Sequence, residues 1–314
     1  MKILVLGAGA VGGYFGARLL EAGSDVSFLV RERRAAHLAR NGLVVRSPRG
    51  DVHLESPPTV QAGAVHGSWD LIILSCKAYD LDTAVEAIAP AVGPHTVILP
   101  LLNGMRHLEI LDARFGAGRV LGGACLISAV LDEEGRIVHL NDRHRLIFGE
   151  RGTPRSARVD AIAREFSRAA FESQPSPAIE QEMWEKWVFL ASLAGATCLM
   201  RGTVADIVAA GGAPWTLALL EQCRAIAAHA GHAPRPQMLE EVRAMLSDPE
   251  LPMRASMLGD VERGAPTEAE HVLGDLLARQ SKGTANGPML ELAVTHLRTH
   301  EARRRREAGA GPRT

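Results

Sequence analysis

The opening sixteen residues constrain the fold more than any other stretch of the chain. The run Lys2–Leu6 has the composition of a strand, and it leads through the hexapeptide GAGAVG at residues 7–12 into an apolar helix pattern. In a G-x-G-x-x-G turn, the first glycine permits a tight turn, the second lets a pyrophosphate approach the backbone, and the third lets the helix pack on its strand. The helix start also presents N–H groups and the positive end of its dipole to phosphates. The sequence predicts dinucleotide binding through Gly7, Gly9, Ala10, Val11 and Gly12; the alternative is a turn with incidental glycines.

The residue after the second predicted strand indicates which dinucleotide is bound. Asp25–Val30 is a second buried-strand candidate, and two parallel strands joined by a helix form a mononucleotide-binding half. Arg31 follows, where an NAD site usually carries a carboxylate for the ribose hydroxyls. Because a guanidinium matches a 2′-phosphate in bidentate geometry, Arg31 predicts NADP(H) as the cofactor. For Arg33 and Arg34, a solvated helix face is the alternative.

Two further strand candidates end in polar residues. The nearly continuous apolar run 69–75 is typical of a strand covered on both faces, and Lys77 follows it. The run 96–102 is followed by Asn103. Ligands of open parallel sheets bind beyond the carboxyl ends of the strands, so Lys77 and Asn103 are candidate cofactor contacts. A surface lysine and an Asn-Gly turn are the structural alternatives.

The pattern changes near residue 155, which indicates two domains. Before it, a hairpin over 43–54 is expected to be peripheral, and strands within 120–149 are expected to complete a mixed edge of the sheet. After it, helix-length patterns follow one another, the first over 155–171 and the longest over 179–200. The sequence therefore predicts an α/β fold: an N-terminal Rossmann-type doubly wound sheet over 1–175, then an all-α C-terminal domain over 176–303. The charged end, 304–314, is predicted to be disordered.

Composition narrows the class of partner. A formal net charge of -1 over 314 residues gives no global attraction to nucleic acid or to an anionic membrane, so a small-molecule partner is favoured. No run approaches the roughly 20 apolar residues of a membrane span, and no charged leader precedes the first strand, so we expect a cytoplasmic protein. The four cysteines are scattered and the twelve histidines show no ligand spacing, which predicts buried thiols and no metal. The helices separated by prolines could offer a homodimer surface.

The helical half carries a second group of polar residues. Lys186, Leu190 and Ala194 lie in one line on the long helix, because residues four apart share a face. A lysine at the head of an apolar line is a candidate catalytic residue, although such side chains often extend to solvent. Downstream, Thr267 and Glu270 have the spacing of a capping box. That structural role leaves Glu268 unexplained.

Together these motifs resemble the ketopantoate reductases (2-dehydropantoate 2-reductases). The resemblance runs from residue 1 to about 300, and no single motif would establish it. It implies an N-terminal Rossmann domain, a helical C-terminal domain, an active site in the cleft between them and NADPH as hydride donor. The motifs that carry it are GAGAVG at 7–12, CKA at 76–78, LNGM at 102–105, WEK at 184–186, SMLGD at 256–260 and TE at 267–268.

The resemblance also implies a role for individual residues. Hydride transfer to a ketone carbon leaves negative charge on the oxygen, which a nearby ammonium can stabilise and protonate. The implied activity is reduction of 2-dehydropantoate, or a related branched 2-keto acid, to the 2-hydroxy acid. The implied site comprises Lys186 as catalytic lysine, Glu268 as its partner carboxylate, Asn103 and Ser256 at the substrate, Lys77 near the reacting centre and Arg31 at the 2′-phosphate.

The chain departs from the family pattern at two positions in the implied pocket. The family usually carries asparagines four and eight residues after its catalytic lysine, both turned toward the substrate. This chain has Leu190 and Ala194 there. An apolar wall forfeits the discrimination that hydrogen-bonding groups provide, so the sequence predicts a more apolar or larger substrate than ketopantoate.

Two other functions remain open at this level. A dehydrogenase of the 3-hydroxyacid type shares the layout and also uses a helical lysine, but the Ser-Met-Leu and Thr-Glu segments argue against it. A nucleotide-binding sensor or scaffold without turnover is the other alternative. It is favoured by Leu190 and Ala194, which replace two asparagines of the family pattern.

Overall fold

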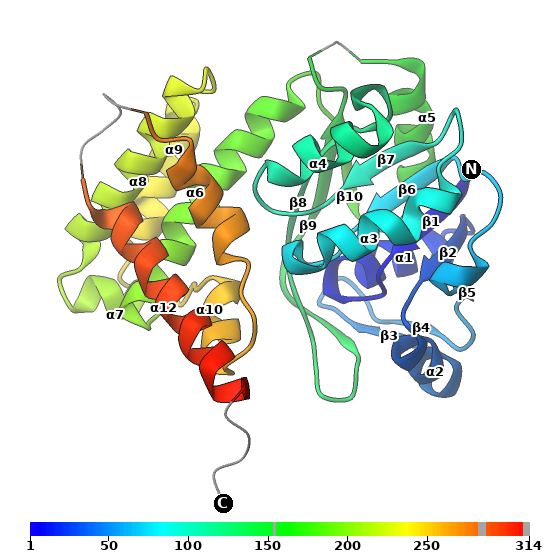
Figure 1. Cartoon of the computed structure of the whole chain (residues 1–314), viewed down its shortest axis with the longest axis horizontal. Helices are drawn as coiled ribbons and strands as arrows, with labels where there is room; N and C mark the ends of the chain where they lie inside the picture. The colour runs from blue at the N-terminus through cyan, green and yellow to red at the C-terminus, as the bar shows by residue number, and fades with distance from the viewer. Residues whose placement is uncertain (153–154, 282–286, 310–314) are drawn as a thin grey trace, which may run out of the picture. The chain divides into compact units, whose positions relative to one another are not determined.

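The computed structural model describes residues 1–152, 155–281 and 287–309, which divide into two compact units (Figure 1). The first unit comprises Met1–Leu102 and His107–Glu182, and the second comprises Asn103–Arg106 and the chain from Met183 onward. The first contains parallel strands with helices and the second is helical, which confirms the predicted fold class. The division between the units falls after residue 182, inside a helix, whereas the sequence suggested residue 175.

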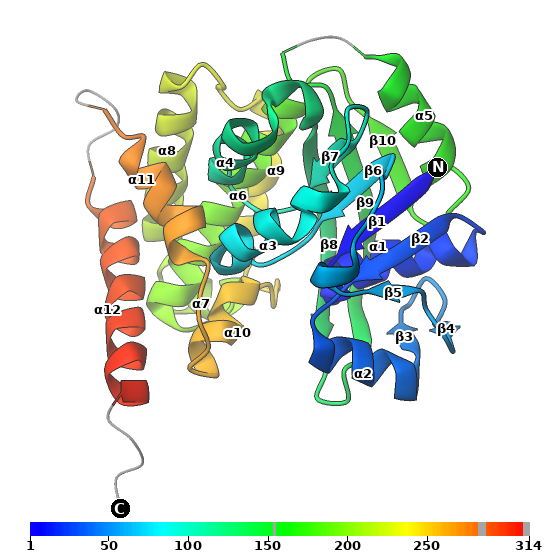
Figure 2. The same cartoon turned by 45° about the vertical axis from the view of Figure 1, so that its right-hand side comes forward.

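A five-stranded parallel sheet forms the framework of the first unit (Figure 2). Its order is β5-β2-β1-β6-β7, so the chain builds outward from β1 in one direction and then in the other. The carboxyl ends of β1 and β6 therefore flank the switch point of the sheet, where ligands bind in open α/β folds. The strands are β1 (Lys2–Leu6), β2 (Asp25–Leu29), β5 (Thr59–Val60), β6 (Leu71–Leu74) and β7 (Val97–Pro100).

Helices and short helical turns connect these strands. Their polar faces are exposed and their apolar faces pack on the sheet, as in α3, where Leu81, Ala84, Val85 and Ile88 are buried. The helices are α1 (Ala10–Glu21), α2 (Glu32–Asn41), α3 (Leu81–Ile88) and α4 (Arg106–Phe115), with 3₁₀ turns η1 (Ala62–Ala64), η2 (Ala78–Asp80), η3 (Ala89–Ala91) and η4 (Ala117–Arg119). α4 and η4 follow the last strand of this sheet and lead out of it.

A second sheet replaces the mixed edge that the sequence predicted. Its order is β10-β9-β3-β4, with β8 antiparallel to β9 along nearly the whole of both strands. The hairpin of β3 and β4 is integral to this sheet, because β3 pairs with β9. The strands are β3 (Leu43–Arg46), β4 (Val52–Leu54), β8 (Gly122–Leu131), β9 (Ile137–Gly149) and β10 (Glu172–Pro175).

The helix predicted over 155–171 is shorter in the structure. α5 (Ala157–Phe166) is capped by Ser156, whose hydroxyl accepts a bond from Val159 N, and it ends where the chain turns toward β10. No apolar pattern marks β10 in the sequence, because Glu172–Pro175 is polar and alternates between exposed and half-buried residues.

Helix α1 packs against strands of both sheets, and this position accounts for its composition. It contacts β1 and β2 of the parallel sheet and β3, β4, β8 and β9 of the second. Its residues 12–19 are all buried, as expected for a helix covered on both sides. A Cβ atom on Gly13 would lie 2.5 Å from Cδ1 of Ile137, and one on Gly16 would lie 2.5 Å from the ring of Phe28. These glycines allow both sheets to approach the helix.

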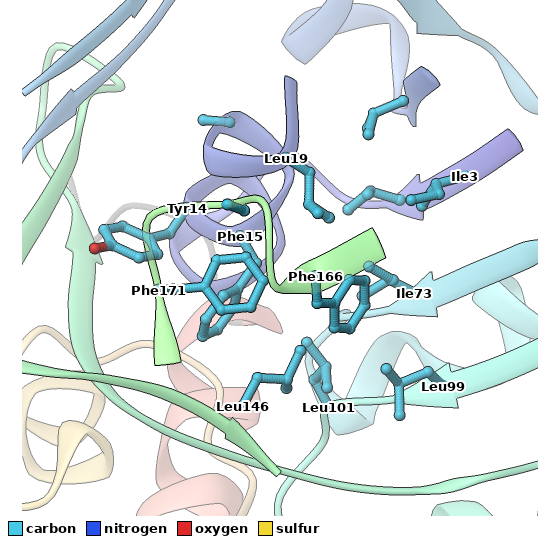
Figure 3. Close-up of a cluster of buried hydrophobic side chains, with 14 of the residues drawn as sticks. Ile3, Tyr14, Phe15, Leu19, Ile73, Leu99, Leu101, Leu146, Phe166 and Phe171 are labelled. Atoms are coloured by element: carbon cyan, nitrogen blue, oxygen red, sulfur yellow. The ribbon is translucent and has the colours of Figure 1, made fainter. Parts of the chain in front are cut away.

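Aromatic side chains fill the core around α1 (Figure 3). Phe15 meets Phe171 edge-on with 5.0 Å between ring centroids, and Phe171 meets Phe166 at 5.7 Å. Edge-to-face pairs of this kind contribute about 0.5–1.5 kcal/mol beyond the burial of their area. This core fixes the helix whose first turn belongs to the predicted dinucleotide site.

A buried histidine pair lies beside the same helix. The ring of His144 stacks on that of His139, and Nδ1 of His144 is 2.8 Å from the hydroxyl of Tyr14. Burial, and then the positive charge of Arg49 and the neighbouring His139 and Arg18, lower the pKa of His144. Below about pH 6.5 the unfolded chain binds a proton that folded His144 resists, so folding stability falls as the pH decreases.

We expect this pair to cause part of any acid sensitivity of the fold. The urea midpoint should be lower at pH 5.0 than at pH 7.5, and His144→Gln should reduce that difference. Replacing the exposed His66 by glutamine is the matched control, and it should leave the difference unchanged. Equal pH dependence in the wild type and the His144 variant would contradict the assignment.

The second unit is a cluster of helices. α12 packs against α8 and the π-helical turn η5. Thr203 and Asp206 form a capping box at the start of α7, and prolines occupy the first turns of α8 and α9. The elements are α6 (Ile179–Met200), which begins in the first unit, α7 (Val204–Ala209), α8 (Ala213–His229), α9 (Pro236–Leu246), α10 (Ser256–Glu262), η5 (Glu270–Gly274), α11 (Asp275–Ala278) and α12 (Met289–Gly309).

The C-terminal end differs from the prediction of disorder. α12 continues to Gly309, so residues 304–309 are helical, and residues 310–314 lie outside the described residues. Ion pairs along the helix, from Arg303 to Glu307 and from Arg304 to Glu301, offset the charge of the arginine run. Across the described chain, no helix is both long and apolar enough to cross a membrane.

Candidate active site

The glycine turn has the geometry that dinucleotide binding requires. Gly7 adopts φ +92°, a conformation that side chains disfavour. A Cβ on Gly12 would overlap Oγ of Ser75 and lie 2.5 Å from Gly7 O, so the helix approaches the β6 end as closely as backbone permits. Among the described residues, a Cβ on Gly9 would meet no heavy atom within 4 Å. Gly9 therefore borders open space, which fits a pyrophosphate against the backbone.

The start of α1 faces the same place with its N–H groups. Gly9 is the N-cap residue and has no side chain to cap the helix. As at any helix start, the N–H groups of Ala10 and Val11 have no intrahelical acceptor. Ser75 Oγ donates to Leu6 O at 2.8 Å and fixes the turn to β6. The residues of this turn fit a dinucleotide phosphate.

The three arginines after β2 have different roles. Arg34 Nε donates to Ala8 O at 3.0 Å and its NH1 donates to Gly135 O at 2.8 Å, so this side chain braces the glycine turn. Burial lowers the pKa of Arg34. Arg33 is exposed, which agrees with the alternative that it lies on a solvated helix face. The Arg31 side chain is 72% exposed, and its NH2 lies 2.7 Å from Oδ1 of Asp80.

The loop after β6 completes this edge of the sheet. Lys77 is the N-cap residue of η2, half-buried, and Asp80 ends that turn. The pairing of Arg31 with Asp80 raises the pKa of the guanidinium through a hydrogen bond and charge attraction. Of the four cysteines, Cys125, Cys198 and Cys223 are buried as expected, whereas Cys76 in this loop is half-buried. Burial raises the pKa of Cys198 and of Cys223 to about 12.

Lys186 lies in the second unit, on α6, and a neighbouring residue fixes its helix to the segment that carries Glu268. Trp187 is almost fully buried, and its Nε1 donates to Val272 O at 2.7 Å. Val272 belongs to the π-helical turn η5, and its own N–H donates to Glu268 O at 2.9 Å. Two steps of hydrogen bonding therefore connect the residue after Lys186 to Glu268. Isolated π-helical turns of this kind are frequent at functional sites.

Asn103 belongs to the second unit. The segment Asn103–Arg106 groups with the helices, and Gly104 at φ +77° packs so closely that a Cβ would lie 2.7 Å from His271 O. His271 is buried and interacts with the Asn103 backbone. Burial lowers the pKa of His271, against the opposing charges of Glu268 and Asp275. The structure thus brings Asn103 to the Glu268 segment, and within the described residues it belongs to a different unit from the dinucleotide turn.

The remaining candidates lie along one face of α6. Leu190 is half-buried and Ala194 is 4% exposed. Further along the same face, Oγ1 of Thr197 accepts a bond of 3.4 Å from Ala255 N, which holds the start of α10 beside α6. Ser256, the first residue of α10, is exposed and lies next to this contact. It stands beside the helix about three turns beyond Lys186.

Several supporting residues gave no usable signal in the sequence. Glu185 is buried and accepts bonds from Arg235 N and Nε, both at 2.8 Å, which holds α6 to the start of α9 directly beside Lys186. Trp184 stacks on His232 with 5.2 Å between ring centroids. The residues involved are distant in sequence, so only the fold reveals these contacts.

The capping box suggested for Thr267 does not form. Its N–H and hydroxyl both donate to Oε1 of Glu301, at 2.7 and 2.9 Å, while Glu270 pairs with Arg298. The carboxylate that binds Thr267 is therefore that of Glu301 on α12, and not that of Glu270 as the sequence spacing predicted. In the portion of the chain that is described, no group of three or more His, Cys, Asp or Glu side chains is arranged to hold a metal ion.

Comparison with known proteins establishes the family. A family profile described as "Ketopantoate reductase PanE/ApbA" matches residues 3–152, and its C-terminal counterpart matches residues 178–301. The chain belongs to the ketopantoate reductase family. It is therefore an oxidoreductase, and the resemblance drawn from the glycine turn, Lys186 and Glu268 is confirmed at the level of family.

Individual relatives cover nearly the whole chain. An "Uncharacterized oxidoreductase YkpB" of Bacillus subtilis is 38% identical over 303 residues, covering 96% of this chain and 99% of the relative. A 2-dehydropantoate 2-reductase of Mesorhizobium japonicum is 30% identical over 86% of this chain and 88% of its own. The crystal structure of 2-dehydropantoate 2-reductase from Geobacter metallireducens superposes with a TM-score of 0.85 at 28% identity, covering 95% of this chain and 99% of that one.

Proposed function

We propose that this protein reduces a branched 2-keto acid to the 2-hydroxy acid with NADPH as a hydride donor, and that Lys186 is the general acid. Family membership supports the class of reaction, and the open space beside Gly9 supports a dinucleotide. The observation that carries the proposal is the bond from Trp187 to Val272, because it ties the helix of Lys186 to the segment of Glu268. By residue type alone, Arg31 after β2 indicates NADP(H).

The proposed roles follow from the charge that develops in the reaction. A bound nicotinamide supplies the hydride. As the carbonyl carbon accepts it, the oxygen becomes negative, and the Lys186 ammonium stabilises this charge and donates the proton. Glu268 orients the ammonium. Asn103 and Ser256 bind the substrate, and Lys77 contacts the cofactor.

Leu190 and Ala194 set the proposed substrate preference. Their side chains give the face of α6 beyond Lys186 an apolar character, and they offer no hydrogen bond to a substrate hydroxyl. A pocket of this kind gains about 1–3 kcal/mol for each well-placed methylene of the substrate. We therefore propose a more apolar or larger 2-keto acid than ketopantoate.

A panel of 2-keto acids tests this function. Initial rates of NADPH and NADH oxidation would be measured with ketopantoate and with 2-keto acids of increasing apolar side chain. We expect kcat/KM for an apolar keto acid to exceed that for ketopantoate by about tenfold or more. Leu190→Asn should narrow the difference, because the amide restores a partner for the hydroxyl of ketopantoate.

The outcomes separate the alternatives. Ketopantoate turnover at tens per second with a low KM would refute the apolar pocket. Oxidation of 3-hydroxy acids with NADP⁺, and no reduction of 2-keto acids, would identify a 3-hydroxyacid dehydrogenase. Tight NADPH binding without turnover of any acid would identify a non-catalytic sensor.

A further inference from the structure

The ion pair of Arg31 and Asp80 stands at the place where the adenosine ribose is expected. Arg31 follows β2 and Asp80 follows β6, the two strands that flank β1 in the sheet. Both residues therefore lie at the carboxyl edge of the sheet, on either side of the glycine turn. Their atoms NH2 and Oδ1 are 2.7 Å apart.

This pair changes what Arg31 offers to a ligand. A lone guanidinium at this position attracts a 2′-phosphate, which carries close to two negative charges at neutral pH. Here a carboxylate already accepts from the guanidinium, and it would repel the phosphate from the same short distance.

Neighbouring arginines do not compensate for this carboxylate. Arg34 donates to Ala8 O and Gly135 O on the side of the glycine turn, and its NH2 is buried without a hydrogen-bond partner within the described residues. Arg33 is exposed on α2. A ligand without the 2′-phosphate meets no such penalty, because a carboxylate accepts hydrogen bonds from ribose hydroxyls.

We propose that Asp80 determines the cofactor specificity of this chain: by pairing with Arg31 it weakens selection for the 2′-phosphate, so that NADH and NADPH bind with similar affinity. The inference rests on the proposed function only in requiring a pyridine nucleotide at the glycine turn. It changes the consequence of Arg31, which by itself indicates NADP(H).

Direct binding titrations test this role without reliance on turnover. Dissociation constants for NADH and NADPH would be measured by nucleotide fluorescence for the wild type and for Asp80→Asn, which keeps the shape and removes the charge. We expect the wild-type constants to lie within about tenfold of each other. Asp80→Asn should shift the ratio toward NADPH by about tenfold, mainly by tightening NADPH, and 0.5 M salt should reduce this shift.

Two further variants make the test specific. Asp82→Asn removes an exposed carboxylate two residues away on α3 and should leave the ratio unchanged. In an Arg31→Ala background, Asp80→Asn should change the ratio of the two dissociation constants less, because the guanidinium for which the Asp80 carboxylate and the 2′-phosphate compete is absent. A ratio unaffected by Asp80→Asn, or a wild-type preference for NADPH above about 100-fold, would overturn the inference. Failure to bind either dinucleotide would instead overturn the proposed function.

Discussion

Replacing Lys186 with alanine is expected to lower kcat by about 10² to 10⁴ while changing the dissociation constant of the dinucleotide less than about twofold. A positioned general acid contributes a rate factor of this size because it acts on charge that develops only as hydride arrives. Lys186 lies on α6 in the helical unit, whereas the glycine turn, Arg31 and Lys77 lie in the other. Loss of its ammonium should therefore affect catalysis and leave cofactor binding intact.

Steady-state rates and nucleotide titrations on the same preparations would measure both quantities. Lys186→Arg is the matched variant, since it keeps a cation on the same helix position while holding its proton far more tightly. It should retain substrate binding and lose most of the rate. If instead NADPH affinity collapsed in Lys186→Ala while kcat at saturation was preserved, Lys186 would be a cofactor ligand and the proposed role would be wrong.

Elements that depend on residues close together in the sequence were predicted better than elements that depend on distant ones. The bounds of α6 were predicted as the structure has them, and a helix follows the glycine turn as expected. Both helices carry local signals: a glycine turn starts α1, Gly23 at φ +82° follows it, and a long apolar pattern defines α6. Such signals are set by neighbouring residues alone.

Elements that depend on distant partners were predicted less well. β9 pairs with β8, β3 and β10, which lie far apart in the sequence, whereas the strands within 120–149 were expected at the edge of a single sheet. Thr267 found its partner on α12, 34 residues away, instead of in its own first turn. No sequence motif singles out Asp80. Its proposed effect on cofactor binding follows only from its hydrogen bond with Arg31 in the structure.

The second large expected effect is on dinucleotide binding, and it comes from substituting Gly9 in the glycine turn. Gly9 and Gly12 lack a side chain for different reasons. Gly9→Ala should leave the free energy of unfolding within about 0.5 kcal/mol of the wild type, since φ is -85° and no heavy atom of the described chain lies within 4 Å of the new Cβ. It should weaken dinucleotide binding by on the order of 100-fold, which corresponds to about 2.8 kcal/mol. The methyl group would occupy the space in which the pyrophosphate approaches the backbone.

Gly12→Ala should affect folding first. Its Cβ would overlap Oγ of Ser75 and press on Gly7 O, so α1 must move away from β6 at a cost of about 1–3 kcal/mol or more. Since α1 packs against both sheets, the helix has little freedom to move without disturbing the core of Phe15 and Phe171. Combining the change with Ser75→Gly removes one of the two obstacles and should recover part of the lost stability.

Urea unfolding and nucleotide titration together separate these two glycines. A Gly9 variant that unfolds at the wild-type urea concentration and fails to bind would show that the open space beside Gly9 is the ligand site. A Gly9 variant that binds both nucleotides as the wild type does would contradict the placement of the pyrophosphate beside Gly9. If Gly12→Ala kept full stability, the close contact between the start of α1 and Ser75 would not be the reason for its glycine. The order of effects, binding for Gly9 and stability for Gly12, follows from what surrounds each Cβ position.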